Sequence, residues 1–364
     1  MRDVLLYDNI IDTSMQRGVD RYFREIATGV AQSFRDRSGL ISMRRREVGM
    51  RRFPMVRLPR RVPKRAYDHQ AAAFVRLIRP EVVLSAYFGR LEVPARMVFP
   101  LYDMIYERFP EHFSPTNRRI IRFVEEKRMC LERADMILAI SHSTAADLVE
   151  IYPKIDRSRI RVTHLGVEES FFGAAPTGRS AMAGGNDPYL LHVGNQAGYK
   201  NFERLLEGFA QSGLARDFQL VAVSPTGESL TPHAKSLIAA RGLRDRVRIR
   251  ARVSDSELRS LYAAAVALVY PSEYEGFGLP ILEAMASGTL VATSNRSSMP
   301  EVGGSAAFYF DPTSPDDIAA RLVEIVALSD AERSLLQQAG IARAREFTWG
   351  RCRDQTNAAI RSLL

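Results

Sequence analysis

The sequence has few cysteines, only Cys130 and Cys352 among its 364 residues. Two cysteines are too few for a disulfide framework, and their scarcity is typical of a reducing compartment. Long apolar runs are also absent. The longest uncharged one, residues 261–270, has about half the length of a membrane-spanning helix, and the apolar run before Asp8 is too short for a signal peptide. The sequence therefore predicts a cytoplasmic protein without a transmembrane helix.

Metal-binding patterns are missing too. The six histidines follow none of the zinc-binding spacings, and no Asp-x-Asp motif stands at the end of an expected strand. His142 lies in the turn SHSTAAD, where Ser141 and Ser143 are expected to cap the following helix. We therefore expect no metal site and no cofactor.

The net charge of +9 comes from one segment. Between Arg44 and Arg65, in RRREVGMRRFPMVRLPRRVPKR, ten Lys and Arg residues accompany one acid, Glu47, which is a local balance of +9. The rest of the chain is neutral, so a partner would meet one basic patch. The segment is interpreted as a solvated loop, as a contact to an anionic membrane surface or lipid-linked acceptor, or as a nucleic-acid contact. No RNA- or DNA-binding motif accompanies it, so we expect no nucleic-acid partner.

Short β-type runs alternate with helical stretches along the chain, which is the pattern of parallel α/β sheets. The first series of expected strands is VLLYD (4–8), EVVLSA (81–86), RMVFPLYD (96–103) and DMILAI (135–140), with helices over 21–34, 116–134 and 143–151. The second series is YLLHVG (189–194), FQLVAVS (218–224), VRIRA (247–251), VALVYP (266–271), TLVAT (289–293) and AAFYF (306–310). Two such series predict two doubly wound sheets, and the cleft between two such domains is the expected ligand site.

We predict an N-terminal domain over residues 1–172, a linker over 173–187 and a second domain over 188–346. The remaining residues, 347–364, are expected to form a helix that packs back on the N-terminal domain. The linker prediction rests on GAAPTGRSAMAGGND, which is rich in Gly, Ala and Ser and has almost no large apolar residue.

Two acids surround a constrained turn in EYEGFGLPILEAMASG, residues 273–288. The turn follows an expected strand and leads into a helix in which Pro280 is expected at the first helical position and Glu283 in the first turn. A helix that starts there behind a glycine turn offers backbone N–H groups and a partial positive charge to a phosphate. Glu283 would accept hydrogen bonds from sugar hydroxyls, and Glu275 would face the other end of the ligand. The pattern predicts a site for a nucleoside diphosphate that carries a polyol, although a purely structural first-turn acid would explain Glu283 alone equally well.

The segment EYEGFGLPILEAMASGTLVATSNRSSMPEVGGSAAFYFDP resembles the donor-binding core of the retaining glycosyltransferases of glycosyltransferase family 4. Other segments agree in order and spacing: RGVDRYFREI, AISHSTAADLVEIYP, RIRVTHLGVEESFF, LHVGNQAGYKNFERLLEGFA and VSDSELRSLYAAAVALVYPS. The resemblance spans nearly the whole chain. It implies the GT-B fold, in which two Rossmann-like domains face each other across a cleft.

The resemblance implies roles for the residues that match the family motifs. Glu275 would contact the donor sugar near the reacting carbon, and Glu283 would bind the ribose. Lys200, in GYKN after the strand that ends at Gly194, would stabilise the charge of the leaving diphosphate. The backbone amides that would face the diphosphate belong to Gly276, Phe277, Gly278 and Leu279.

One family residue is missing, because Asn195 stands where many relatives carry an arginine as a second phosphate cation. Arg252, which precedes Val253 in the expected donor site, or Arg17 could replace that cation. In the N-terminal domain, Asp103 follows an expected buried strand at a place where the family often has His-Asp, and it is interpreted as a group that positions or deprotonates the acceptor hydroxyl. Gly18 resembles the family's glycine loop beside the donor diphosphate.

We therefore expect a metal-independent, retaining hexosyltransferase. It would move a hexose or deoxyhexose from a nucleoside-diphosphate sugar, which is a substrate and not a cofactor, to a saccharide acceptor linked to a lipid, in cell-surface polysaccharide or glycolipid synthesis. The protein would then be cytoplasmic and peripheral to the inner face of the membrane. Two alternatives remain open: a sugar-nucleotide 2-epimerase on the same architecture, and a non-catalytic GT-B protein that binds sugar nucleotides.

Overall fold

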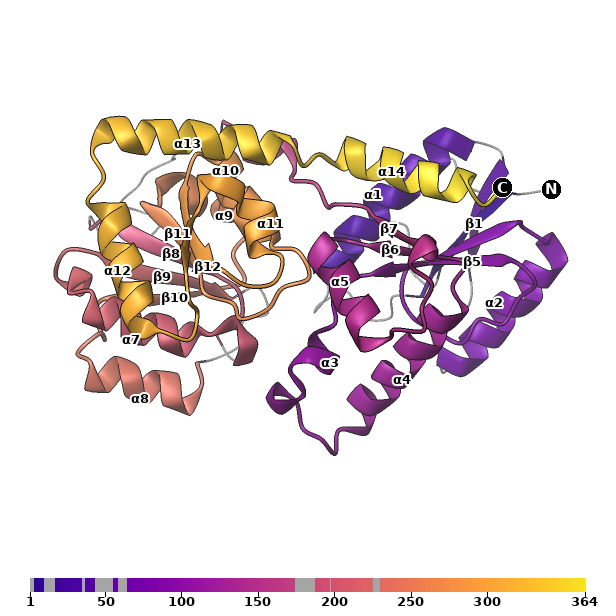
Figure 1. Cartoon of the computed structure of the whole chain (residues 1–364), viewed down its shortest axis with the longest axis horizontal. Coiled ribbons are helices and arrows are strands. Elements are labelled where there is room, and N and C mark those ends of the chain that lie inside the picture. The colour runs from indigo at the N-terminus through magenta and orange to yellow at the C-terminus, as the bar shows by residue number, and fades with distance from the viewer. Residues whose placement is uncertain are drawn as a thin grey trace. The chain divides into compact units, whose positions relative to one another are not determined.

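The structure is a computed structural model, and it describes residues 3–9, 17–34, 37–42, 55–57, 64–173, 187–196, 198–224 and 230–364. The chain divides into two compact units (Figure 1). The first comprises Met1–Leu165 together with Trp349–Leu364, and the second comprises Gly166–Thr348. Most of the expected linker, residues 174–186, lies outside the described residues.

The first unit contains a seven-stranded sheet in the order β3-β2-β1-β4-β5-β6-β7, and every neighbouring pair is parallel. The strands are β1 (Val4–Asp8), β2 (Ser38–Ser42), β3 (Met55–Arg57), β4 (Val82–Ser85), β5 (Arg96–Leu101), β6 (Met136–Ala139) and β7 (Ile160–Val162). The helices of this unit are α1 (Arg17–Phe34), α2 (Lys64–Ile78), α3 (Ile105–Arg108), α4 (Arg118–Arg133), α5 (His142–Ile151) and α14 (Trp349–Arg361).

The second unit contains a six-stranded parallel sheet in the order β10-β9-β8-β11-β12-β13. The strands are β8 (Tyr189–Val193), β9 (Gln219–Ser224), β10 (Val247–Ala251), β11 (Ala267–Tyr270), β12 (Leu290–Ser294) and β13 (Phe308–Phe310). The helices are α7 (Phe202–Gln211), α8 (Pro232–Ala240), α9 (Asp255–Ala264), α10 (Leu279–Ala286), α11 (Met299–Gly303), α12 (Pro315–Val326) and α13 (Asp330–Arg345). The predicted α/β class with two parallel sheets is confirmed.

The core of the second unit explains the strand pattern. On one sheet face, apolar side chains of the strands meet those of α7, α8 and α12, for example Leu220 with Phe209 and Leu322 in one buried cluster. On the other, α10 contacts β11, β12, α9 and α13. Because helices cover both faces, the strands are buried on both sides and read as continuous apolar runs.

The C-terminal helix α14 belongs to the first unit. It packs on α1 (Figure 1), where Arg353 forms an ion pair with Glu25 at 2.5 Å and the Asn357 amide donates to the Gly29 carbonyl at 3.3 Å. The first unit ends at Leu165, earlier than the expected domain end at residue 172, because Val167 pairs with Thr348 in a parallel bridge of the second unit.

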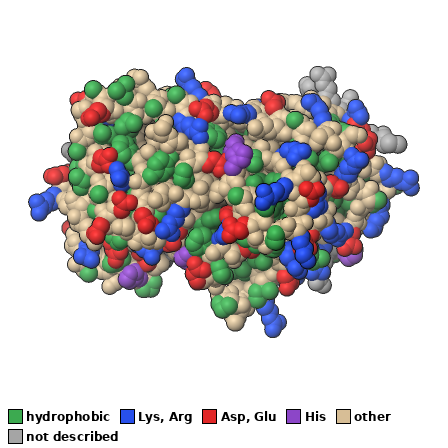
Figure 2. Space-filling model, in the orientation of Figure 1, with side chains coloured by type: hydrophobic (Ala, Val, Ile, Leu, Met, Phe, Trp, Pro, Cys, Tyr) green, Lys and Arg blue, Asp and Glu red, His purple; other side chains and the backbone are tan. Residues whose placement is uncertain are grey.

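The basic segment is described only in part. Met55–Arg57 forms the edge strand β3 beside β2, whereas residues 43–54 and 58–63 lie outside the described residues. On the face that Figure 2 shows, the Lys and Arg side chains lie among Asp and Glu side chains. None of the described helices is long and apolar enough to cross a bilayer.

Candidate functional site

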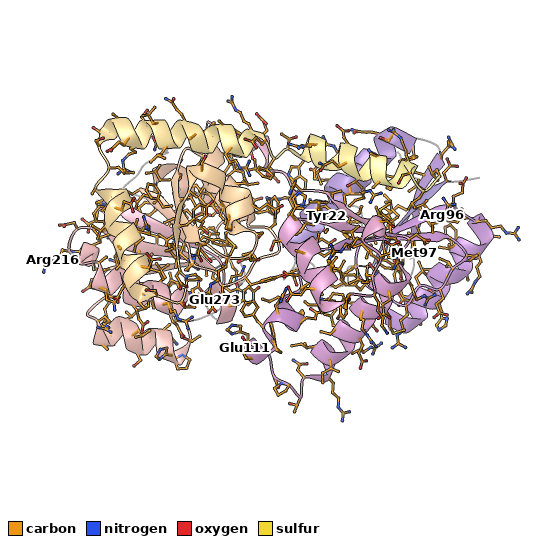
Figure 3. All side chains as sticks on the ribbon, in the orientation of Figure 1. Tyr22, Arg96, Met97, Glu111, Arg216 and Glu273 are labelled. Atoms are coloured by element: carbon orange, nitrogen blue, oxygen red, sulfur yellow. The ribbon has the colours of Figure 1, made fainter. Side chains whose placement is uncertain are left out.

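The turn that carries the two acids lies at the carboxyl end of β11. The chain leaves the strand at Tyr270, passes through the loop of Glu273 (labelled in Figure 3) and Glu275, and enters α10 at Leu279. Gly278 adopts the left-handed conformation (φ 109°, ψ 47°), which costs little for a residue without a Cβ atom.

The start of α10 corrects two expectations. Since Gly278 turns the chain directly into the helix, α10 begins one residue earlier than expected, and Pro280 is its second residue rather than its first. Glu283 is the fifth residue and lies in the second turn, not in the first. An acid beyond the first turn gains little from the helix dipole. The purely structural explanation of Glu283 is therefore weaker than the sequence suggested.

Lys200 and Glu275 form a direct ion pair. The Lys200 Nζ lies 2.6 Å from Glu275 Oε1, and the two side chains are 16% and 12% exposed. Tyr270, at the end of β11, donates its hydroxyl to the same oxygen at 2.7 Å, and the Lys200 Nζ lies 3.5 Å from that hydroxyl. The Lys200 ammonium also lies over the rings of Tyr199 and Tyr270, at 5.1 and 5.7 Å from their centroids.

The charges of this cluster follow from its contacts. Burial alone would lower the pKa of Lys200, but the neighbouring Glu275 raises that pKa well above its usual value. Burial, followed by Glu275, raises the pKa of Tyr270 well above its usual value. At neutral pH the lysine therefore keeps its positive charge, and the phenol keeps its proton as a hydrogen-bond donor.

The backbone around Glu275 is held by two serines of the loop after β12. Ser297 donates to the Glu275 carbonyl at 2.7 Å and accepts from the Glu275 N–H at 3.4 Å. The buried Ser298 hydroxyl lies 2.9 Å from the Glu275 carbonyl oxygen and 2.7 Å from that of Phe277. Ser297 has a φ of 53°, an uncommon conformation for a residue other than glycine that is often found at functional sites. The turn therefore has a defined shape.

The loop that carries Lys200 is tied to the same turn. Lys200 ends the 3₁₀ turn Gly198–Lys200, and the buried Asn201 follows it in the left-handed conformation (φ 60°). The Asn201 amide donates to the Pro271 carbonyl at 3.1 Å, and the Glu273 N–H donates to the Tyr199 carbonyl at 2.8 Å. These bonds fix the backbone of Lys200 relative to that of Glu275.

Glu283 has a different partner. Its carboxylate is buried within α10, and Tyr262 of α9 donates its hydroxyl to Glu283 Oε2 at 3.0 Å. Tyr262 is itself fully buried and lies edge to face against Phe171, with ring centroids 5.9 Å apart. The two predicted donor-binding acids therefore have separate tyrosine partners.

Gly194 and His192 border the lysine from β8. A Cβ atom at Gly194 would lie 3.6 Å from His192 Nε2 and 3.9 Å from the Lys200 Cδ. The His192 ring is fully buried, and its Nδ1 lies 3.2 Å from the Val269 carbonyl. Burial lowers the pKa of His192 to about 4, so the imidazole is neutral at neutral pH. It then donates from Nδ1 to the Val269 carbonyl.

Comparison with known families decides where the chain belongs. The family described as "Glycosyl transferases group 1" matches residues 179–342, and the family described as "Glycosyltransferase Family 4" matches residues 17–171. The "O-antigen chain mannosyltransferase B" of Escherichia coli is 30% identical over 278 residues, which are 74% of this chain and 71% of that protein. The chain is a family 4, group 1 glycosyltransferase.

A second relative and two solved structures agree with this assignment. The "MMP alpha-(1->4)-mannosyltransferase" of Mycolicibacterium hassiacum is 31% identical over 294 residues, which are 74% of this glycosyltransferase and 67% of that protein. The fold is similar to that of sucrose-phosphate synthase from Thermosynechococcus elongatus (TM-score 0.79, 19% identity, 100% and 99% of the two chains). It is also similar to that of Anabaena HepE in complex with UDP-glucose (TM-score 0.77, 16% identity, 100% of both chains). The glycosyltransferase has the GT-B fold.

Two residues of the predicted site, Asp103 and Gly18, belong to the first unit of the glycosyltransferase. Asp103 follows β5 and is partly buried, and its Oδ1 accepts at 3.1 Å from the N–H of Ile105, the first residue of α3. Its carbonyl accepts from the Lys127 ammonium at 3.3 Å. Asp103 therefore has a structural contact at the place where an acceptor role is predicted.

The sequence suggested that Gly18 lies in a loop, but the structure places it in a helix. Helix α1 begins at Arg17, so Gly18 is its second residue, and a Cβ atom there would meet nothing within 4 Å. The expected helix start at residue 21 was too late, because residues 17–20 already belong to the helix. The side chain of Arg17 lies outside the described residues.

The replacement for the missing arginine stays a prediction. Asn195 is partly exposed after Gly194, whereas Arg252 follows β10, which lies two strands away from β8 in the sheet. Arg252 has an exposed side chain and a left-handed backbone (φ 55°), and Val253 after it is buried.

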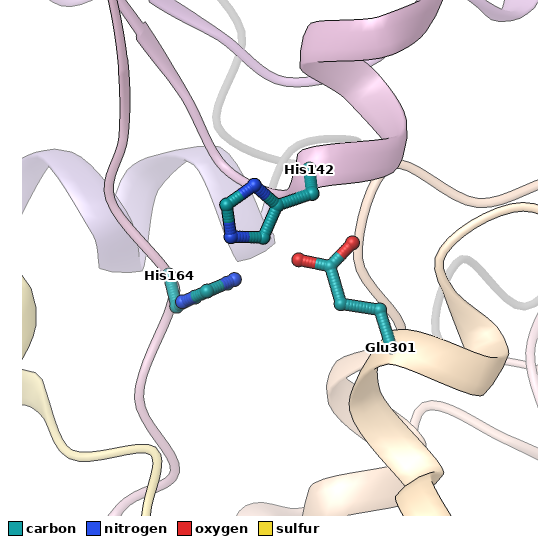
Figure 4. Close-up of side chains that lie close together, drawn as sticks. All are labelled: His142, His164 and Glu301. Atoms are coloured by element: carbon teal, nitrogen blue, oxygen red, sulfur yellow. The ribbon is translucent and has the colours of Figure 1, made fainter.

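Sequence reasoning missed the tyrosines Tyr262 and Tyr270 and the buried His192. The signal for Tyr270 was its position at the second-to-last residue of the expected strand 266–271, just before the turn. Ser141 caps α5 by accepting from the Thr144 N–H at 2.9 Å, as expected. The ring of His142 meets that of His164 edge to face, with centroids 5.3 Å apart (Figure 4).

Proposed function

We propose that this glycosyltransferase moves a hexose from a nucleoside-diphosphate sugar to a saccharide acceptor, with retention of configuration and without a metal ion. The observation that carries the proposal is the pairing of Lys200 with Glu275 beside the start of α10. A largely buried cation beside a helix N-terminus is suited to a leaving diphosphate, and the adjacent carboxylate is suited to sugar hydroxyls.

Each of these groups would have a defined task in the transfer. Lys200 and the first N–H groups of α10 would stabilise the charge that grows on the diphosphate as the sugar departs. Glu283, held by Tyr262 at 3.0 Å, would bind the ribose hydroxyls. Asp103 would orient the acceptor hydroxyl. The charge of Lys200 and of the helix terminus would take the place of a divalent cation.

The names of the relatives support a more specific substrate. Both relatives described above are mannosyltransferases by name, and the name of one refers to O-antigen chains. We propose mannose as the transferred hexose and a growing surface polysaccharide, linked to a lipid, as the acceptor. The basic segment, residues 44–65, would bring the enzyme to the anionic membrane surface that carries this acceptor.

The first test is calorimetric binding of UDP, GDP, dTDP and ADP, followed by transfer assays with the matching mannose and glucose nucleotides. We expect one nucleotide to bind tightly, and Lys200→Ala to reduce transfer about 100-fold or more because the leaving charge loses its cation. Lys235→Ala, which changes an exposed lysine of α8 in the same unit, is the matched control. Unchanged transfer by Lys200→Ala would remove this lysine from the mechanism.

Three further readouts separate the alternatives. Transfer should persist in excess EDTA, and the anomeric configuration of the product, determined by NMR, should match that of the donor. Conversion of the donor without an acceptor would indicate the epimerase instead. If none of the nucleotides binds, the proposed function is wrong.

A further inference from the structure

The pairing of Lys200 with Glu275 raises a question about donor binding. Both side chains are expected to bind the donor, yet in the structure they bind each other. The Lys200 Nζ and the Tyr270 hydroxyl both bind Oε1 of Glu275, at 2.6 and 2.7 Å. A diphosphate that recruits Lys200 must therefore compete with the carboxylate for the ammonium group.

Lys200 can change its partner from the carboxylate to the diphosphate by moving its side chain alone, without a movement of the backbone. The backbones on either side of the ion pair are tied together by the bond from Glu273 N–H to the Tyr199 carbonyl and by the Asn201 amide. Ser297 and Ser298 hold the backbone of Glu275 itself. A lysine has four side-chain torsions, so the ammonium can move while its Cα atom stays in place.

The departure of Lys200 would leave Glu275 as a carboxylate that is only 12% exposed. A buried charge without a partner is costly. Among the described residues, the side chain that still binds the carboxylate is Tyr270, because its hydroxyl donates to the same oxygen and its ring is buried at the end of β11. A hydrogen bond from a neutral donor to a charged group stabilises more than one between two neutral groups.

We propose that Tyr270 is a positioning residue that holds the Glu275 carboxylate in place when Lys200 moves from this carboxylate to the donor diphosphate. The inference rests on the proposed function, since it assumes a nucleoside-diphosphate donor. Tyr270 makes the exchange less costly and keeps Glu275 oriented toward the sugar, although the phenol itself touches neither the phosphate nor the sugar.

The test is a double-mutant cycle on the nucleotide that binds best in the calorimetric panel. Tyr270→Phe keeps the ring over Lys200 and removes only the hydroxyl. We expect it to weaken nucleotide binding up to about tenfold, because the bond to Glu275 stabilises the carboxylate more once Lys200 has left it, and to lower kcat by a similar factor. Glu275→Gln should bind the nucleotide more tightly, because the competing charge is gone, but should not transfer the sugar.

The decisive comparison is Tyr270→Phe in the Glu275→Gln background. If Tyr270 acts through the carboxylate, the second change should alter the nucleotide dissociation constant by less than about twofold. An equal loss of binding in both backgrounds would overturn the inference, because Tyr270 would then contact the ligand directly or merely support the fold.

Tyr189→Phe is the matched control, because it also removes the hydroxyl and the hydrogen bond of a buried tyrosine. Tyr189 is also buried, on the neighbouring strand β8, and its hydroxyl donates to the Leu261 carbonyl at 2.7 Å rather than to a carboxylate. The control should bind nucleotide like the parent protein, and a loss equal to that of Tyr270→Phe would overturn the inference.

If the parent binds and transfers and Tyr270→Phe does the same, this inference alone is wrong. If the parent binds no nucleotide, the proposed function is wrong, and the inference with it.

Discussion

Replacing His192 by phenylalanine should remove part of the protein's loss of stability in acid. The imidazole is fully buried on β8, its ring packs against Phe202 with centroids 5.2 Å apart, and burial lowers its pKa to about 4. An unfolded chain has a histidine pKa of about 6.5. Between these two values the unfolded chain binds a proton that the folded chain does not, so stability falls as the pH falls.

The two pKa values set the size of the effect. Protonation of His192 in the unfolded chain should lower the free energy of unfolding by about 2 kcal/mol between about pH 7 and about pH 5. The loss should reach about 3 kcal/mol once the pH is below the pKa of His192 in the folded protein. We would measure hydrogen exchange of the β8 amides at both pH values, corrected for intrinsic exchange, in the parent, in His192→Phe and in His233→Gln. His233 is exposed, so its variant should behave like the parent. If His192→Phe loses as much stability as the parent between the two pH values, the burial argument is refuted.

Three other substitutions test packing and charge. Lys127→Met should destabilise the first unit by about 3 kcal/mol or more, because it leaves the Glu107 carboxylate buried without the ammonium 2.6 Å away; urea unfolding that matches the parent would contradict this. Gly208→Ala should destabilise the second unit by about 1–3 kcal/mol, since its Cβ would lie 2.7 Å from the Ile318 Cγ2 between α7 and α12; an unchanged melting temperature would show that the helices can separate freely. Gly18→Ala has open space and should leave the melting temperature the same or slightly higher, so weaker donor binding by this variant would indicate a role in function rather than in folding.

Local sequence was sufficient where apolar residues fill most positions of a five-residue strand. The expected segments VLLYD and VRIRA coincide with β1 and β10 residue for residue. Strand β2 was missed because it reads SGLIS, with only two large apolar residues, and yet all five of its residues are buried. Its burial depends on β1 and β3 on either side and on α1, which contacts it, and no local window contains these elements. The three-residue strands β3 and β7 were missed because both are short and carry an arginine.

In the candidate site, too, local features could be predicted from the sequence, whereas contacts between distant residues could not. The turn and its two acids were visible in one stretch of 16 residues, 273–288, because the glycines and the proline mark a strand, a turn and a helix. The contact between Lys200 and Glu275 was not visible, because 75 residues separate them and only the pairing of β8 with β11 brings them together. Tyr270 was missed for a related reason: a tyrosine at a strand end is common, and only the structure shows that its hydroxyl donates to Glu275.

Helix α14 makes the order of synthesis matter for this chain. The second unit is built from one continuous stretch, Gly166–Thr348, and contains all of its own strands and helices by the time that stretch has left the ribosome. The first unit has its complete sheet much earlier, yet the side of α1 that receives Asn357 and Arg353 stays uncovered until residues 349–361 emerge. The first unit is therefore completed only after the second, and nascent chains halted before Trp349 would carry a finished second unit and a first unit without α14.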